Sequence, residues 1–158
     1  MPFVTSWATP DQRVLLSLAK PVIAIFQRYI QTRPSDSEAG GLLLGTVHGS
    51  SLAVTEATVP TPWDKRLQYF FERMPFGHSS IAQARWKASG GTVRYVGEWH
   101  THPQDYPHPS GIDRTEWIKL SRKRADGRSM LAVIVGRKSL YVELVPHDGI
   151  GQAMAPMK

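Results

Sequence analysis

The stretch from Val93 to Asp113 constrains the fold of this chain more than any other part of the sequence. It begins with a strand-like run, Val93–Trp99, that leads directly into His100-Thr101-His102-Pro103. Residues two apart on a strand point to the same face, so the two imidazoles can share one ion. Asp113 follows a Pro-rich loop and can supply a third, anionic ligand. Two histidines and one carboxylate leave the fourth position of a tetrahedral site open for water, which is the arrangement of a catalytic zinc site.

Ser110 and Asp113 also fit a purely structural explanation. The pattern Ser-x-x-Asp before Trp117 and Ile118 is typical of a helix N-cap with an acid in the first turn. The two explanations are compatible, because a helical first turn brings positions three apart to the same side. One turn can hold the Asp113 carboxylate at a metal and the Ser110 hydroxyl beside it.

A second segment, Ser37–Gly45, places Glu38 directly before a glycine pair and an apolar strand. Together with the histidine run, it resembles the JAMM metalloprotease family, also called the MPN or JAB domain. The family pattern is Glu, a variable gap, His-x-His, ten residues and Asp, with Ser three before the Asp. Glu38, His100, His102, Ser110 and Asp113 fill every position, and the resemblance covers residues 14–145.

The resemblance implies a role for each of these residues. His100, His102 and Asp113 would bind Zn²⁺, Glu38 would act as general base, and Ser110 would hydrogen-bond the oxyanion of the tetrahedral intermediate. Water would be the nucleophile in amide hydrolysis, without an acyl-enzyme. The spacing alone does not bring Glu38 to the metal, since 62 residues separate it from His100. Without the family pattern, it is simply a loop carboxylate before a strand.

The residues that bind substrate are not assigned by the sequence. Gln104, Asp105, Tyr106 and His108 border the metal loop and could line a groove, although a solvated histidine is the simpler explanation of His108.

Composition favours one globular domain. The chain has 158 residues, with 41% hydrophobic and 20% charged. We expect a JAB/MPN domain over residues 1–148 and a loose tail over 149–158. No run approaches the ~18 apolar residues that span a bilayer, and no secretory signal is visible. The absence of cysteine excludes disulfides and thiolate metal sites and is compatible with the cytoplasm, where we expect the protein.

Strand and helix patterns alternate irregularly along the chain, which favours the α/β (α+β) class with one central mixed β-sheet flanked by helices. We expect Trp63, Trp99 and Trp117 in the core. The predicted strands are 14–18, 42–47, 52–59, 67–71, 93–99, 130–135 and 140–145, and the predicted helices are 21–30, 78–89 and 112–124.

The formal net charge is +6, and basic residues concentrate in Lys119–Arg124. A nucleic-acid patch is one interpretation, and the exposed face of a helix is the other. The run has no interleaved aromatic residues on which bases could stack, so we favour the helix face.

The resemblance also bears on substrate. The family hydrolyses isopeptide or peptide bonds at the C-terminus of ubiquitin or ubiquitin-like proteins. The segments EAGGLLLG and GEWHTHP most resemble stand-alone bacterial members, encoded beside ubiquitin-activating and ubiquitin-conjugating-like proteins in type II CBASS anti-phage systems. This implies that the substrate is a conjugated cyclic-oligonucleotide synthase, with no membrane partner. The alternatives are processing of a bacterial ubiquitin-like protein, a non-catalytic MPN scaffold and nucleic-acid binding.

Overall fold

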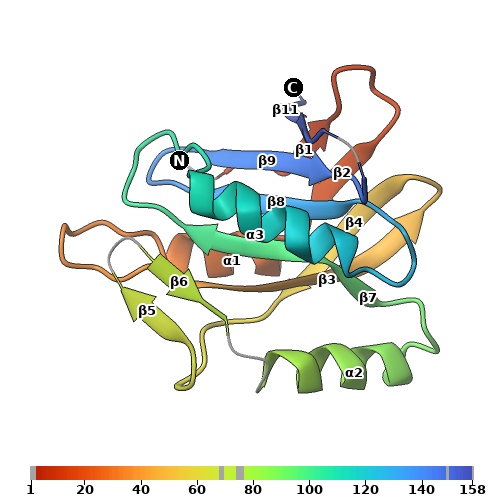
Figure 1. Ribbon diagram of the computed structural model, residues 1–158, viewed down its shortest axis with the longest axis horizontal. Coiled ribbons are helices and arrows are strands. Elements are labelled where there is room, and N and C mark those ends of the chain that lie inside the picture. The colour runs from red at the N-terminus through yellow and green to blue at the C-terminus, as the bar shows by residue number, and fades with distance from the viewer. Residues whose placement is uncertain (1–2, 68–69, 74–76, 149, 158) are drawn as a thin grey trace.

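In the part of the chain that the structure describes, a nine-stranded sheet carries three helices on its surfaces (Figure 1). The computed structural model describes residues 3–67, 70–73, 77–148 and 150–157. The elements in chain order are β1 (Ser6–Ala8), β2 (Leu15–Leu18), α1 (Lys20–Arg28), β3 (Gly40–His48), β4 (Ser51–Ala57), β5 (Lys65–Leu67), β6 (Phe70–Glu72), α2 (His78–Ala88), β7 (Arg94–Thr101), α3 (Gly111–Arg122), β8 (Met130–Val135), β9 (Leu140–Val145), β10 (Gln152–Ala153) and β11 (Ala155–Pro156).

The strand order is β10-β9-β8-β7-β3-β4-β2-β1-β11. The sheet is mixed, because β7 runs parallel to β8 and β2 parallel to β4, while the other pairs are antiparallel. In the central pair, Gly40 of β3 lies opposite His100 of β7. The glycine pair and the histidine run, far apart in sequence, therefore lie side by side.

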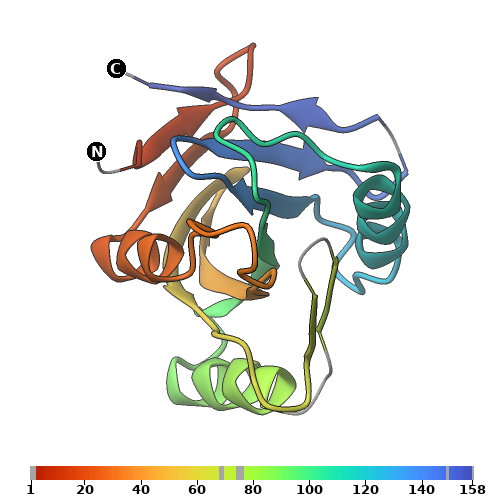
Figure 2. The same ribbon diagram turned by 90° about the vertical axis from the view of Figure 1, so that its left-hand side faces the viewer.

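Alternation along β8 divides the core between the two faces of the sheet. Leu131, Val133 and Val135 belong to the main cluster, while Met130, Ala132 and Ile134 belong to a smaller cluster with Trp117 of α3. This is the period of two expected for a strand buried on both sides. Figure 2 shows α1 and α3 on opposite sides of the sheet.

Helix α1 supplies much of the main cluster. It begins with proline in its first turn, where the missing N–H removes no intrahelical bond. Val22, Ile23 and Phe26 share its buried face, and the Phe26 ring lies 5.3 Å from that of Trp99. The histidine strand is therefore backed by packed aromatic rings.

The C-terminal segment joins the two outer edges of the sheet. β10 pairs with β9, and β11 pairs with β1 at the other end of the strand order. Met154 lies between them and is buried. The segment that we expected to be loose thus contains two short strands. Its backbone donors and acceptors find partners on edge strands, which the local sequence does not reveal.

The expected fold class is confirmed, and two local expectations are wrong. The single strand expected over residues 67–71 is instead a hairpin, with β5 ending at Leu67 and β6 beginning at Phe70; residues 68–69 lie outside the described part. Trp63 precedes this hairpin and is 62% exposed, whereas Trp99 and Trp117 are buried as expected. In the described residues, no helix is both long and apolar enough to cross a bilayer.

Candidate active site

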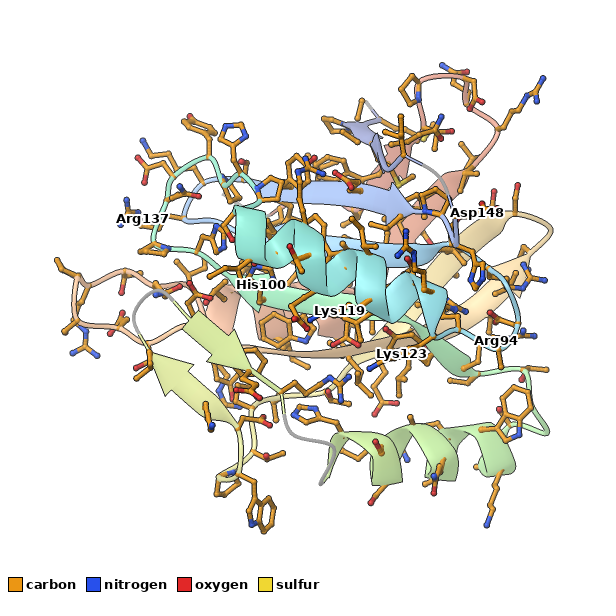
Figure 3. All side chains as sticks on the ribbon, in the orientation of Figure 1. Arg94, His100, Lys119, Lys123, Arg137 and Asp148 are labelled. Atoms are coloured by element: carbon orange, nitrogen blue, oxygen red, sulfur yellow. The ribbon has the colours of Figure 1, made fainter. Side chains whose placement is uncertain are left out.

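Three of the predicted site residues meet where β7 ends and α3 begins. The Nε2 atoms of His100 and His102 are 3.1 Å apart. Asp113, in the first turn of α3, places Oδ1 3.2 Å from His100 Nε2 and Oδ2 3.2 Å from His102 Nε2. Figure 3 shows His100 beside the N-terminal half of α3. The strand, the loop and the helix start thus bring the three donors together, as their spacing predicts.

The donor set fits a zinc ion. Tetrahedral ligands 2.0–2.1 Å from a common ion lie about 3.3 Å from one another, close to the separations of these nitrogen and oxygen atoms. Two imidazoles and one carboxylate are the ligand types of catalytic zinc sites. The side chains are largely buried, with exposed fractions of 10–14%, so one position of such a site can face the groove described below.

Gln104 bonds the outer ring nitrogen of His102. Its Oε1 accepts the main-chain N–H of His108 at 3.2 Å. The same oxygen lies 3.1 Å from His102 Nδ1 and can accept a hydrogen bond from it. With a metal bound, such a bond would leave the lone pair of Nε2 to the ion. This is the outer hydrogen bond that orients metal-binding histidines.

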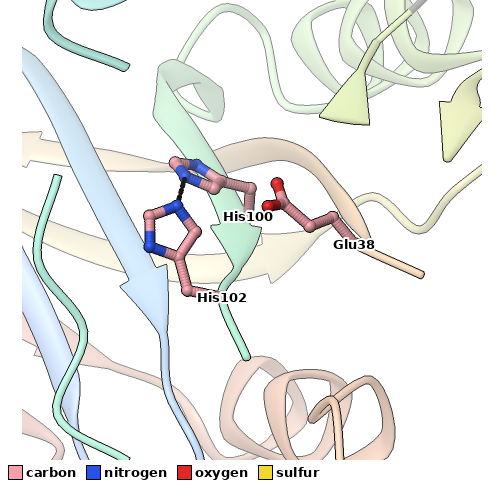
Figure 4. Close-up of side chains that lie close together, drawn as sticks. All are labelled: Glu38, His100 and His102. Atoms are coloured by element: carbon pink, nitrogen blue, oxygen red, sulfur yellow. Dashed lines mark hydrogen bonds between the residues drawn. The ribbon is translucent and has the colours of Figure 1, made fainter. Parts of the chain in front are cut away.

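Glu38 approaches the histidine pair from the residues just before β3. Its carboxylate and the two imidazoles lie within 4.8 Å of one another (Figure 4). Glu38, His100 and His102 could themselves hold an ion, but Asp113 forms ion pairs of 3.2 Å with both imidazoles, and we favour it as the third ligand with Glu38 beside the site. The β3–β7 pairing brings Glu38 here across 62 residues.

Burial dominates the acidity of Glu38, which is 5% exposed. Loss of water raises the pKa of this carboxyl from 4.5 to about 8; the charge of Asp113 adds to the rise, and His102 opposes it. A carboxyl with such a pKa can hold or release a proton near neutral pH.

Asp113 and His102 stabilise each other's charged forms. Burial alone would raise the pKa of Asp113, but hydrogen bonds to His100 and His102 hold that pKa well below its usual range. Burial alone would lower the pKa of His102, but the hydrogen bond to Asp113 and its negative charge have a larger effect, so the pKa of His102 is raised. The site is therefore a compact set of oppositely charged groups.

Ser110 forms the expected N-cap of α3. Its Oγ accepts the N–H of Asp113 at 3.1 Å, and the Asp113 carboxylate accepts the N–H of Ser110 at 2.9 Å. This capping box fixes the Asp113 main chain at the helix start. Because Ser110 Oγ accepts this bond, its own hydrogen remains available to a ligand in the site.

A groove of about 770 Å³ leads away from these residues between α3 and β6. Ile112, Glu116 and Leu120 line it from α3, where they are one turn apart and share a face. Phe71 lines it from β6, and His108 also borders it. The walls of the groove combine apolar side chains with charged ones such as Arg73 and Glu98.

The β5–β6 hairpin also holds the main chain of Glu38. The Glu38 N–H donates to the Leu67 carbonyl at 2.7 Å, and Arg66 Nε donates to the Glu38 carbonyl at 3.0 Å. Thr101 accepts the N–H of the neighbouring Ala39, and its hydroxyl in turn donates to Gln31. Sequence reasoning missed these supporting residues, since no local pattern links them to Glu38. Gln104 was expected only as a groove residue.

The basic run Lys119–Arg124 does not form one free surface. The Arg124 side chain turns inward, is 7% exposed, pairs with Asp126 at 2.8 Å and donates to main-chain carbonyls. Lys119 lies 3.5 Å from Glu116 on the same helix. Lys119 lies in the C-terminal half of α3, and Lys123 lies at its C-terminal end (Figure 3). This arrangement favours the helix-face interpretation.

Comparison with known proteins identifies the class to which this fold and site belong. Residues 24–145 match the family described as prokaryotic homologs of the JAB domain, so the chain belongs to that family. A protein from Pseudomonas aeruginosa called "CD-NTase/cGAS isopeptidase" is 58% identical over 158 residues, covering 100% of both chains. Together the JAB domain and this isopeptidase relative class the chain as a hydrolase.

Other relatives agree. Proteins of the same name from Escherichia coli and Vibrio cholerae are 35% and 36% identical over 121 residues, covering 77% of this chain and 76% of theirs. The solution structure of protein DSY2949 from Desulfitobacterium hafniense superposes with a TM-score of 0.58 at 21% identity, covering 87% of this chain and 88% of that one. This last likeness supports the fold alone.

Proposed function

We propose that this chain is a zinc-dependent isopeptidase that releases a CD-NTase, a cyclic-oligonucleotide synthase, from its protein conjugates in bacterial anti-phage defence. One observation carries the proposal: two imidazoles and two carboxylates from distant segments converge at the end of an open groove. The full-length likeness to an isopeptidase of that named specificity supports the substrate. A functional link to ubiquitin-activating and ubiquitin-conjugating-like proteins belongs to the same proposal.

Each site residue has a distinct task in this proposal. His100, His102 and Asp113 would hold the zinc ion. When bound, zinc supplies Lewis acidity and lowers the pKa of water toward neutrality. Glu38 would take the proton of the attacking water on its carboxylate and pass it to the nitrogen of the leaving amine. The free hydroxyl hydrogen of Ser110 would bond the oxygen that becomes negative as water adds to the carbonyl.

The substrate tail has one suitable strand edge beside the site. The outermost strands of the main sheet are the two-residue strands β10 and β11, far from the histidines in the strand order. Among the described residues, β6 pairs only with β5, and its Phe71 lines the groove. We therefore place the extended C-terminal tail of the substrate against β6 as an added strand, with its last carbonyl at the histidine pair. Main-chain bonds would give affinity, and the apolar face of α3 would select side chains.

The test is a fusion of a cognate synthase C-terminus to a reporter protein. Release at the junction, blocked by a chelator and by Glu38→Ala, is the expected result. Failure to cut this fusion, with cleavage of a ubiquitin-like protein fusion instead, would reassign the substrate to a bacterial ubiquitin-like pathway. Zinc binding without cleavage of either fusion would favour a non-catalytic scaffold.

A further inference from the structure

We propose that Thr101 and Gln31 are positioning residues that hold the segment carrying Glu38 against the histidine strand. The inference rests on the proposed function, in which Glu38 transfers protons. Neither side chain touches the reacting atoms in this proposal. They act through the main chain on either side of Glu38, which we call the Glu38 segment (residues 36–39).

Thr101 is the last residue of β7, between His100 and His102, and its hydroxyl takes the place of a main-chain acceptor. Its Oγ1 accepts the N–H of Ala39 at 2.9 Å, and its own N–H donates to the Ala39 carbonyl at 2.9 Å. Ala39 directly follows Glu38 and precedes the first residue of β3. The hydroxyl of Thr101 thus extends the β3–β7 pairing by one more bond toward Glu38.

Gln31 continues this chain to the other end of the Glu38 segment. Its Oε1 accepts the hydroxyl of Thr101 at 2.8 Å, and its Nε2 donates to the Asp36 carbonyl at 2.9 Å. One amide therefore joins the histidine strand to the main chain two residues before Glu38. The Glu38 segment is held at both ends by a single set of side-chain bonds.

Burial makes these bonds difficult to replace. Thr101 and Ala39 are 0% exposed and Gln31 is 1% exposed, so water cannot take over a lost bond without local rearrangement. Removing the Thr101 hydroxyl would take away the acceptor of the buried Ala39 N–H and break the link from Thr101 to Gln31. The Ala39 N–H would then favour conformations in which the Glu38 segment moves outward to reach water.

A small movement of this segment matters because proton transfer depends on distance. A general base must lie within about 2.6–3.2 Å of the proton it takes, or one water away. A misplacement of about 1 Å can lower the rate by about 10²-fold. The β5–β6 hairpin bonds of Glu38 lie on the exposed side, so the Thr101–Gln31 chain supplies the buried side of its support.

The experiment compares two buried threonines that make equivalent bonds. Thr58 is 3% exposed; its Oγ1 accepts the N–H of Leu42 at 2.7 Å and bonds the His78 imidazole at 2.6 Å. Thr58→Val therefore removes a matched hydroxyl from the end of the β3–β4 pairing, on the other side of β3, without touching the Glu38 segment. Thr101→Val and Thr101→Ser are measured beside it on the reporter fusion, with zinc content and melting temperature for each.

We expect Thr101→Val to lower kcat by about 10²-fold with KM and zinc content unchanged. Thr101→Ser should restore kcat to within a few-fold of wild type, because it keeps the hydroxyl. Thr58→Val should lower the melting temperature to a similar degree and leave kcat unchanged. If Thr101→Val does not fold, Gln31→Met provides the same test from the other end of the chain, with an expected loss of kcat at constant KM.

Equal kcat values for Thr101→Val and Thr58→Val would overturn the inference, as would loss of zinc from Thr101→Val. In the event that only Gln31→Met folds, an unchanged kcat would overturn it. The failure of the proposed function is a separate outcome: a wild-type protein that cuts no fusion overturns both, whereas an active wild type with an inactive Glu38→Ala leaves the function intact.

Discussion

Replacing Glu38 with glutamine should change how the stability of the metal-free protein depends on pH. Burial raises the pKa of Glu38 from 4.5 to about 8. Below 4.5 the folded and unfolded states both carry the proton. Between 4.5 and about 8 the unfolded state releases it and the folded state retains it, so rising pH favours unfolding. The wild-type protein should therefore lose stability as pH rises through this window.

The size of the effect follows from the shift. At about 1.4 kcal/mol per pKa unit, the full separation corresponds to about 5 kcal/mol. Glu38 borders the open groove, so screening by solvent reduces the observable effect, and we expect about 2–3 kcal/mol. Glutamine carries no titrating group but keeps the size of the side chain. Glu38→Gln should thus differ little from wild type at pH 5, where most of the loss is still to come, and exceed its stability by nearly this amount at pH 8.5.

Urea unfolding in the presence of a chelator, from pH 5 to 8.5, measures the difference directly. The raised pKa of His102 also makes the folded state less stable as pH rises. This contribution is present in both proteins, so it largely cancels in the difference between them. Glu116→Gln removes a carboxylate from the exposed wall of the same groove and serves as the control. Parallel stability curves for wild type and Glu38→Gln would refute the argument that burial holds a proton on Glu38.

The ligands, the helix cap, the hairpin and the tail each allow a separate test. His102→Ala should lower zinc content from about one per chain to near zero by metal analysis, and full retention of zinc would contradict its place as a ligand. Ser110→Ala should cost about 1 kcal/mol of stability as a lost cap and ~10²–10³-fold in kcat as a lost oxyanion donor; a change in melting temperature alone would leave it a cap only. Arg66→Ala removes a bond to the Glu38 carbonyl and should lower kcat roughly tenfold, whereas Lys65→Ala next to it should not; equal rates would exclude support by the hairpin. Deleting residues 150–158 removes the buried Met154 and should destabilise the protein by about 2–5 kcal/mol and promote association through open strand edges, and a monomer of wild-type stability by denaturation and light scattering would contradict this.

The part of the site that is local in sequence was predictable from sequence physics. His100, His102 and Asp113 are connected by one strand end and one helix start, and both elements have fixed periodicities that place side chains. Glu38 was predictable only through the family pattern. Its position beside the histidines depends on the pairing of β3 with β7. Neither segment contains a local pattern that predicts a strand partner 62 residues away.

Other features depend on contacts that no local pattern encodes. Gln31 follows an ordinary helix end, and its role comes from a buried amide that bonds two distant segments. Trp63 is large and apolar, but the turn before β5 places it outward. The tail has neither helical nor strand periodicity, and its pairing is decided by the edges that it meets. In each case the partner determines the structure of the segment.

The C-terminal segment that pairs with both β9 and β1 has a consequence for folding during synthesis. Trp7 pairs with Pro156, so the outer edge of β1 stays uncovered until a segment about 150 residues later has been made. The N–H of Met157 then donates to the Ser6 carbonyl, which completes the pairing of β11 with β1. Until that moment, a nascent chain can complete β2 to β9 yet still offer two strand edges to other molecules. Closure is therefore a late, non-local step, and we expect it to be the stage at which chaperones have the most to protect.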